Sequence, residues 1–166
     1  MTQRFLKFIE WVISWEGSVF EDDKSDPGGK TKYGIDQRSH PKVDIRNLTK
    51  EQAEEIYWNE SWVKLHAEEL PLGVSEILSN IAINTGYGHA TKWLHFALNT
   101  QVDGIIGPNT IKLANAANRQ DLNNKLLDHL EQYYHDIAAY GDNQKFIKGW
   151  LHRTDSLREF VNQLKP

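Results

Sequence analysis

Residues 3–36 read QRFLKFIEWVISWEGSVFEDDKSDPGGKTKYGID, and they join a helical pattern to an irregular loop. Four apolar residues in the first half have the spacing of one helix face: Phe5, Phe8, Ile9 and Val12. Gly17 follows as a helix stop. The segment 17–36 then loses helical periodicity around an Asp-Pro-Gly-Gly turn. We therefore expect a helix over 3–16, followed by a loop or a short irregular hairpin.

Helical periodicity continues through most of the remaining chain. Thr49 and Gln52 have the spacing of a capping box, which opens the next helix. Outside 17–36, only 102–107 carries a strand pattern. Helices are expected at seven further segments: 49–62, 71–84, 89–99, 109–117, 121–140, 143–153 and 155–164. The sequence thus predicts an all-α fold with a small irregular β or loop element.

The turn-rich stretch VDGIIGP, residues 102–108, marks the one candidate domain boundary. It divides the chain into 1–98 and 99–166. Because no linker rich in Pro, Ser or Gly separates these two halves, we expect them to pack as one compact unit.

The composition argues against several classes of partner. A net charge of -4 over 166 residues supplies no basic field for binding nucleic acid. No apolar run approaches the ~20 residues needed to cross a bilayer, so stable membrane insertion is not expected. The absence of cysteine removes disulfides and thiolate chemistry. The N-terminus carries charges inside its apolar stretch and does not have the pattern of a signal peptide.

Glu16 lies on the apolar face of the first expected helix. On a helical wheel it falls about 20° from Phe5, whereas Glu10 lies on the opposite face. Partial burial and the negative end of the helix dipole both favour the protonated form of a carboxyl group at this position. A general acid for glycoside cleavage requires that form near neutral pH. The alternative is a capped or salt-bridged structural Glu at a helix end.

The loop after Glu16 offers a second group for such chemistry. Glycosidases need a residue that stabilises positive charge on the sugar or activates water. Asp26 is followed by Gly28 and Gly29, which let the backbone approach a ligand closely, and then by the hydroxyl of Thr31. Neighbouring loop aspartates, Asp22 and Asp23, are expected to be solvated.

The run WEGSVFEDDKSDPGGKTKYGID, residues 15–36, resembles the signature of glycoside hydrolase family 108. Members of this family are N-acetylmuramidases, found as phage endolysins and as secretion-linked muramidases. The signature reads roughly Glu-Gly-Gly, a short spacer, then Asp-x-Gly-Gly-x-Thr-x-x-Gly-Ile. This chain departs from it at Ser18, where a second Gly is usual. The matching positions are Glu16, Gly17, Asp26, Gly28, Gly29, Thr31, Gly34 and Ile35.

The resemblance extends over almost the whole chain. The stretch 80–86 is similar to a helix end of the family, although Asn80 stands where Asp is common. VDGIIGPNT (102–110) and KGWLHR (148–153) resemble the small peptidoglycan-binding domain that follows. The resemblance implies a lysozyme-like catalytic domain over 1–98 and a helical peptidoglycan-binding domain over 99–166.

The implied reaction is hydrolysis of the β-1,4 bond between N-acetylmuramic acid and N-acetylglucosamine in bacterial peptidoglycan. Glu16 would be the general acid, while Asp26 and Thr31 would place water or stabilise the oxocarbenium-like transition state. Two alternatives stay open. A lytic transglycosylase also depends on one Glu, and a non-catalytic module would bind peptidoglycan without cleaving it.

Further substrate contacts are expected at Gly28, Gly29, Tyr33 and Asn84. Asn84 falls at the edge of its helix's apolar face. It could therefore position a sugar group or tie the helix end to a loop.

No metal or cofactor is expected. Two histidine pairs, at 89/95 and 129/135, are spaced six residues apart, which does not place them on one helix face. The expected partner is the glycan strand of peptidoglycan, and the expected state is a monomer. We expect synthesis in the cytoplasm, release by a holin or a secretion route, and action in the periplasm or cell wall.

Overall fold

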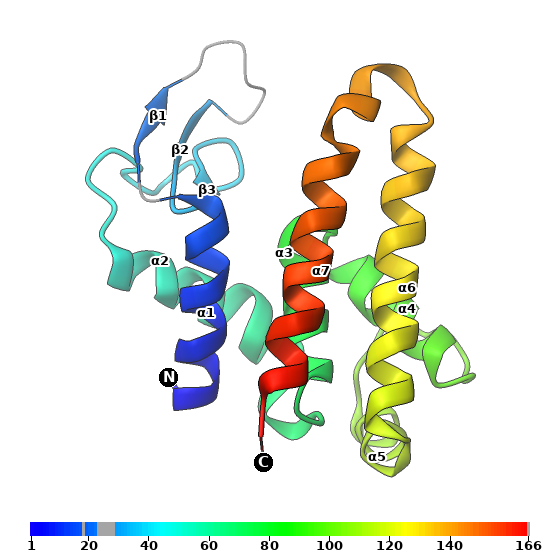
Figure 1. Cartoon of the computed structure of the whole chain (residues 1–166). Coiled ribbons are helices and arrows are strands. Elements are labelled where there is room, and N and C mark those ends of the chain that lie inside the picture. The colour runs from blue at the N-terminus through cyan, green and yellow to red at the C-terminus, as the bar shows by residue number, and fades with distance from the viewer. Residues whose placement is uncertain (18, 23–28, 166) are drawn as a thin grey trace. The chain divides into compact units, whose positions relative to one another are not determined.

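The computed structural model describes residues 1–17, 19–22 and 29–165. The fold is mostly helical with one small sheet, which confirms the predicted fold class (Figure 1). The chain divides into two compact units, Met1–Glu60 and Ser61–Pro166, which are described separately below. The expected domain boundary at 98/99 and the packing of the two halves as one body stay predictions.

The first unit is organised around helix α1, Gln3–Glu16. Thr2 caps its start by accepting a hydrogen bond from the backbone N–H of Phe5. Gly17 ends it at φ 79°, as predicted, with its N–H bonded to the Ile13 carbonyl. The apolar face found in the sequence is fully buried, at Phe5, Phe8, Ile9 and Val12. Burial of each such side chain contributes about 1.5–3 kcal/mol to stability, so this face anchors the helix.

A three-stranded antiparallel sheet lies at the C-terminal end of α1 (Figure 1). Its strands are β1 (Glu21–Asp22), β2 (Lys30–Lys32) and β3 (Ile35–Asp36). The central strand pairs Thr31 with Glu21 on one side and with Asp36 on the other. Tyr33 and Gly34 join β2 to β3, and both have positive φ, at 54° and 76°. A two-residue hairpin turn of type I′ requires that conformation at both positions.

Helix α2, Lys50–Tyr57, opens with the predicted capping box between Thr49 and Gln52. It continues into a π-helical turn, η1, Trp58–Val63, so the helix expected over 49–62 is only partly α-helical. Trp58 meets Phe5 of α1 edge-on, with ring centroids 5.0 Å apart. This contact packs α2 against the buried face of α1.

The second unit begins with a short 3-10 turn, η2 (Ala67–Glu69), and then builds on α3 (Val74–Thr85) and α4 (Tyr87–Ala97). The first turn of α3 is capped by Glu76, whose carboxylate accepts from the Gly73 N–H at 2.7 Å. A single residue, Gly86 at φ 95°, separates α3 from α4. The expected helices over 71–84 and 89–99 left four residues between them, whereas in the structure only Gly86 lies outside a helix.

Three further helices complete the second unit: α5 (Pro108–Ala116), α6 (Arg119–Ala138) and α7 (Ile147–Gln163). The 3-10 segment η3, Gly141–Phe146, connects α6 to α7, which run side by side (Figure 1). Leucine and isoleucine side chains from four of the helices form the core: Leu78, Ile81, Leu94, Leu126, Leu130 and Leu157.

Two local predictions were wrong. The helices expected over 143–153 and 155–164 are one continuous helix, α7. Thr154 is an ordinary helical residue there, because its hydroxyl donates to the Trp150 carbonyl at 3.0 Å instead of capping a new helix. Residues 102–107 form a loop with no strand, and Gly104 turns the chain at φ 78°.

Candidate active site

Glu16 is the last residue of α1, and its half-buried side chain is in contact with the β2–β3 turn. A methyl group built on Gly34 would come within 2.8 Å of the Glu16 Cγ atom and 2.5 Å of the Tyr57 hydroxyl. Only a residue without a Cβ leaves room for the Glu16 side chain at this distance. The close packing of Glu16 and Tyr57 therefore explains why the signature has glycine at position 34.

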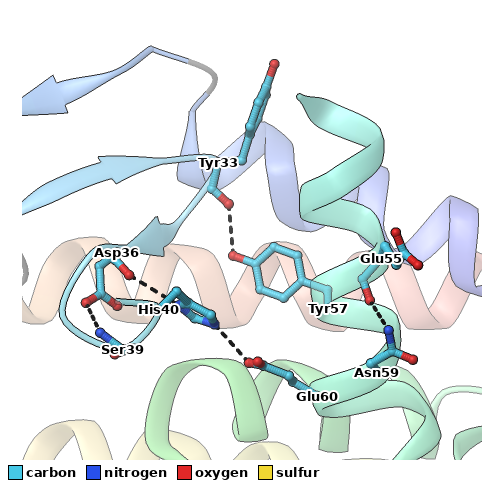
Figure 2. Close-up of polar contacts among 8 residues, drawn as sticks. All are labelled: Tyr33, Asp36, Ser39, His40, Glu55, Tyr57, Asn59 and Glu60. Atoms are coloured by element: carbon cyan, nitrogen blue, oxygen red, sulfur yellow. Dashed lines mark hydrogen bonds and ion pairs between the residues drawn. The ribbon is translucent and has the colours of Figure 1, made fainter. Parts of the chain in front are cut away.

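Tyr57 holds the same turn from the other side. Its hydroxyl donates to the Tyr33 carbonyl at 2.9 Å, as Figure 2 shows. Tyr57 is almost fully buried on α2, so this bond fixes the turn to the helical part of the unit. Three elements of the first unit, α1, the β2–β3 turn and α2, thus converge on Glu16. Sequence reasoning did not identify Tyr57 as part of this arrangement.

Tyr33, expected to contact substrate, has a defined backbone role. It adopts a positive φ, which costs a non-glycine residue about 1–2 kcal/mol, and the bond from Tyr57 helps to offset that cost. Its ring points away from Tyr57 (Figure 2), and the Lys32 ammonium lies 5.4 Å from the ring centroid. A substrate contact by this ring stays a prediction.

The remaining loop residues of the expected site are only partly described. Thr31 is half-buried on the central strand, and its hydroxyl donates to the Gly29 carbonyl at 3.5 Å. Gly29 has a φ of 72°, the conformation that favours glycine. Asp26 and Gly28 lie outside the described residues, so their roles stay predictions.

Asn84 belongs to the second unit, on the last turn of α3. Its amide donates to the Asn80 carbonyl at 2.8 Å and to the Asn80 side-chain oxygen at 3.0 Å. The same Asn80 oxygen accepts from Arg153 of α7 at 3.3 Å. Asn84 is thus bonded within its own helix, and Asn80 connects that helix to α7. A tie between the helix end and a loop, which the sequence left open, stays a prediction. A sugar contact by Asn84 stays a prediction.

A second polar cluster, which the sequence did not reveal, connects the end of β3 to the π-helical turn (Figure 2). His40 lies 3.0 Å from a Glu60 carboxylate oxygen through Nε2, and its Nδ1 lies 3.2 Å from the Asp36 carbonyl. Burial raises the pKa of the Asp36 carboxyl, but hydrogen bonds from Ser39 outweigh this effect, so the pKa lies below its usual value. The cluster holds the loop after β3 in place.

The first unit also has an open surface pocket of about 620 Å³. It is formed by the loop 42–48 and by α2 with the π-helical turn, from Gln52 to Glu60. None of the expected site residues that the structure describes lines it. The assignment of Glu16 therefore rests on its contacts and not on this pocket.

Comparisons with known proteins agree with the fold and the motif. Residues 9–86 match the family described as glycosyl hydrolase 108, and residues 89–155 match the family described as a predicted peptidoglycan domain. The solved structure of SagA from Brucella abortus is similar, at 29% sequence identity and a TM-score of 0.80. That match covers 95% of this chain and 92% of SagA. No curated protein is significantly similar. The chain therefore belongs to the glycosyl hydrolase 108 family over its first half and continues in a peptidoglycan domain.

Proposed function

We propose that this protein is an N-acetylmuramidase that cleaves the β-1,4 bond between N-acetylmuramic acid and N-acetylglucosamine, with Glu16 as the general acid. The two matched families together support the broader class, a peptidoglycan hydrolase. The observation that carries the proposal is the contact of Glu16 with Gly34. Both residues belong to the segment that matches the glycosyl hydrolase family.

The chemistry needs a proton donor held at a fixed position. Glu16 lies at the end of a helix whose apolar face is buried, and the turn containing Gly34 restricts its side chain. Such restriction supports proton transfer to a glycosidic oxygen, because general acid catalysis depends first on geometry. In the proposed reaction Glu16 gives its proton to the leaving oxygen while positive charge develops on the muramic acid ring.

Asp26 and Thr31 are the proposed partners of that step. A second group must stabilise the oxocarbenium-like transition state or place the attacking water. Thr31 lies on the strand that leads into the Glu16-contacting turn. Asp26 is proposed from its position in the signature alone.

We further propose that the protein acts in the periplasm or cell wall, because its proposed substrate is found there. A holin or a dedicated secretion route would release it. None of the helices within the described residues is long and apolar enough to span a membrane.

The proposal is tested by digesting purified sacculi with the wild-type chain, Glu16→Gln and Glu10→Gln. Glu10 is an exposed carboxylate on the same helix and provides the matched control. We expect Glu16→Gln to lose at least ~10²-fold in rate, because the amide has no proton to donate, and Glu10→Gln to stay near wild type. Retention of a tenth or more of the rate by Glu16→Gln would refute the assignment.

Mass spectrometry of the released fragments identifies the reaction. Muropeptides with reducing ends support hydrolysis by water. Anhydro-muropeptides would instead indicate a lytic transglycosylase. Binding to sacculi with no fragment released by the wild-type chain would indicate a non-catalytic module.

A further inference from the structure

Five aromatic rings of the second unit form a connected surface cluster, which we name the α4–α6 aromatic face. Its members come from one stripe of α4 and one stripe of α6: His89, Trp93, Phe96, His129 and Tyr133. The spacing of four and three residues along α4, and of four along α6, places each set on one helix face. The face is therefore built from regular helix geometry and not from a loop.

Trp93 is the centre of this cluster. It stacks nearly parallel to His89, at a centroid distance of 5.1 Å, and to His129, at 6.2 Å. Tyr133 lies 5.5 Å from Trp93 and 5.1 Å from His89. Because Trp93 is only 7% exposed, it holds the outer rings in fixed positions and is not itself the contact surface.

The outer rings are accessible. Phe96 is 48% exposed, and His89, His129 and Tyr133 are half-buried. Phe96 contacts the other rings through His129, and the centroids of these two rings are 6.2 Å apart. The core between these helices is filled by other residues, Ala90, Leu94, Leu126 and Leu130. The cluster is thus additional to the core, and connected exposed apolar surface of this kind marks binding sites.

We propose that the α4–α6 aromatic face binds the glycan strand of peptidoglycan by stacking sugar rings on Phe96 and Tyr133. Aromatic rings present broad apolar faces, which suit the C–H faces of sugars, and the Tyr133 hydroxyl adds a polar group for sugar hydroxyls. Every ring of the face lies within residues 89–155, the segment that matches the peptidoglycan domain. The inference rests on the proposed function, because it takes peptidoglycan as the ligand.

Polar groups beside the rings fit the same ligand. The Lys92 ammonium lies 5.5 Å from the Phe96 ring centroid and can pair with the carboxylates of the stem peptide. His89 Nδ1 donates to the Thr85 carbonyl at 2.9 Å, since that carbonyl can only accept. Nε2 of the neutral ring is then an acceptor for a sugar hydroxyl or an acetamido N–H.

The test measures binding of the full-length chain to purified sacculi, with Glu16→Gln as background so that the wall is not digested. The test variant is Phe96→Ala with Tyr133→Ala, and Phe96→Ala alone is a second variant. Phe146→Ala is the matched control. Phe146 lies in the same family match, is 49% exposed and has Lys145 at 5.0 Å from its ring, but it lies outside the face.

We expect the double variant to raise the Kd by about tenfold, as the loss of two stacking contacts predicts, and Phe96→Ala to raise it about threefold. Phe146→Ala should bind like the parent. Thermal melting of each protein checks folding. If the double variant does not fold, Phe96→Ala decides the question, because its side chain is half exposed.

Unchanged binding by the Phe96 variant would overturn the inference, as would an equal loss for Phe146→Ala. A dimer in the parent, lost on Phe96→Ala with sacculus binding intact, would assign the face to a second copy of the chain and would also overturn it. These outcomes are separate from the proposed function. That function fails if the chain with Glu16 intact releases no muropeptides or only anhydro-muropeptides, or if Glu16→Gln keeps a tenth or more of the digestion rate.

Discussion

Gly34→Ala is expected to damage both the stability of the first unit and its activity. The new methyl group would lie 2.5 Å from the Tyr57 hydroxyl and 2.8 Å from Glu16 Cγ. These distances are about 0.9 Å and 0.6 Å shorter than ordinary van der Waals contact, which begins near 3.4 Å. Gly34 also has a φ of 76°, which alanine adopts only with strain. The substitution must therefore displace Glu16, Tyr57 or the turn itself.

The expected loss of stability is about 3 kcal/mol. The positive φ contributes about 1 kcal/mol, and overpacking together with a weakened Tyr57–Tyr33 hydrogen bond contributes about 2 kcal/mol. For a chain of this size that corresponds to a melting temperature about 6–12 °C lower. Because a displacement of about 1 Å can cost ~10²-fold in rate, we expect kcat on sacculi to fall by at least ~10-fold.

Gly29→Ala is the control for the conformational part of this loss. Gly29 has a similar φ of 72°, but a methyl group there meets no atom within 4 Å among the described residues. It should lose only about 1 kcal/mol. Thermal melting compares the stability of the two variants. A sacculus digestion assay, run well below both melting temperatures, compares their activity. If Gly34→Ala melts within about 2 °C of Gly29→Ala and keeps wild-type kcat, the close contact between Gly34 and Glu16 matters neither for stability nor for activity.

Three further predictions follow from other residues. Asp26→Asn should reduce sacculus digestion at least ~10²-fold, whereas Asp22→Asn, exposed on β1, should stay near wild type; the reverse result would show that the signature is misaligned. At Asp36, burial is outweighed by hydrogen bonds and the pKa is lowered, so the stability that this carboxylate adds is present above pH 3.8 and lost as the pH falls through the lowered pKa. The stability advantage of wild type over Asp36→Asn, measured by urea unfolding, should therefore shrink below about pH 4; a constant difference would contradict this. His95→Ala should cost about 3 kcal/mol and speed hydrogen exchange in the loop 103–107, because His95 is 1% exposed and lies 3.1 Å from the Ile105 carbonyl; unchanged exchange would disprove that anchoring role.

The parts of the fold that the sequence predicted are those that depend on local pattern. The buried stripe of α1, its end at Gly17 and the capping box at Thr49 all involve residues within a few positions of one another. Helix periodicity and capping chemistry are visible at that range. The prediction divided α7 at Thr154, a residue type that is common at helix N-caps. In the structure the Thr154 hydroxyl donates to the Trp150 carbonyl within the same helix, so the helix continues.

The candidate site was predicted only as a set of residue types. The signature identified Glu16 and Gly34, but their contact depends on a hairpin turn that brings residues 18 positions apart together. Tyr57 was missed because it acts through its hydroxyl on a backbone carbonyl 24 residues away, with no local signal. His40 and Glu60 were missed for the same reason, since 20 residues separate them.

The position of the single residue between α3 and α4 affects how the genes for such proteins can recombine. The glycosyl hydrolase match ends at residue 86 and the peptidoglycan match begins at residue 89, so the border between the two families falls at Gly86. The second unit, however, contains α3, which packs on α4 and α6. Genetic recombination at the family border would part α3 from the helices that bury its apolar face. Exchange of the peptidoglycan segment between genes is therefore expected to succeed only when the new segment carries a matching surface for α3, which favours joint descent of the two segments over free shuffling.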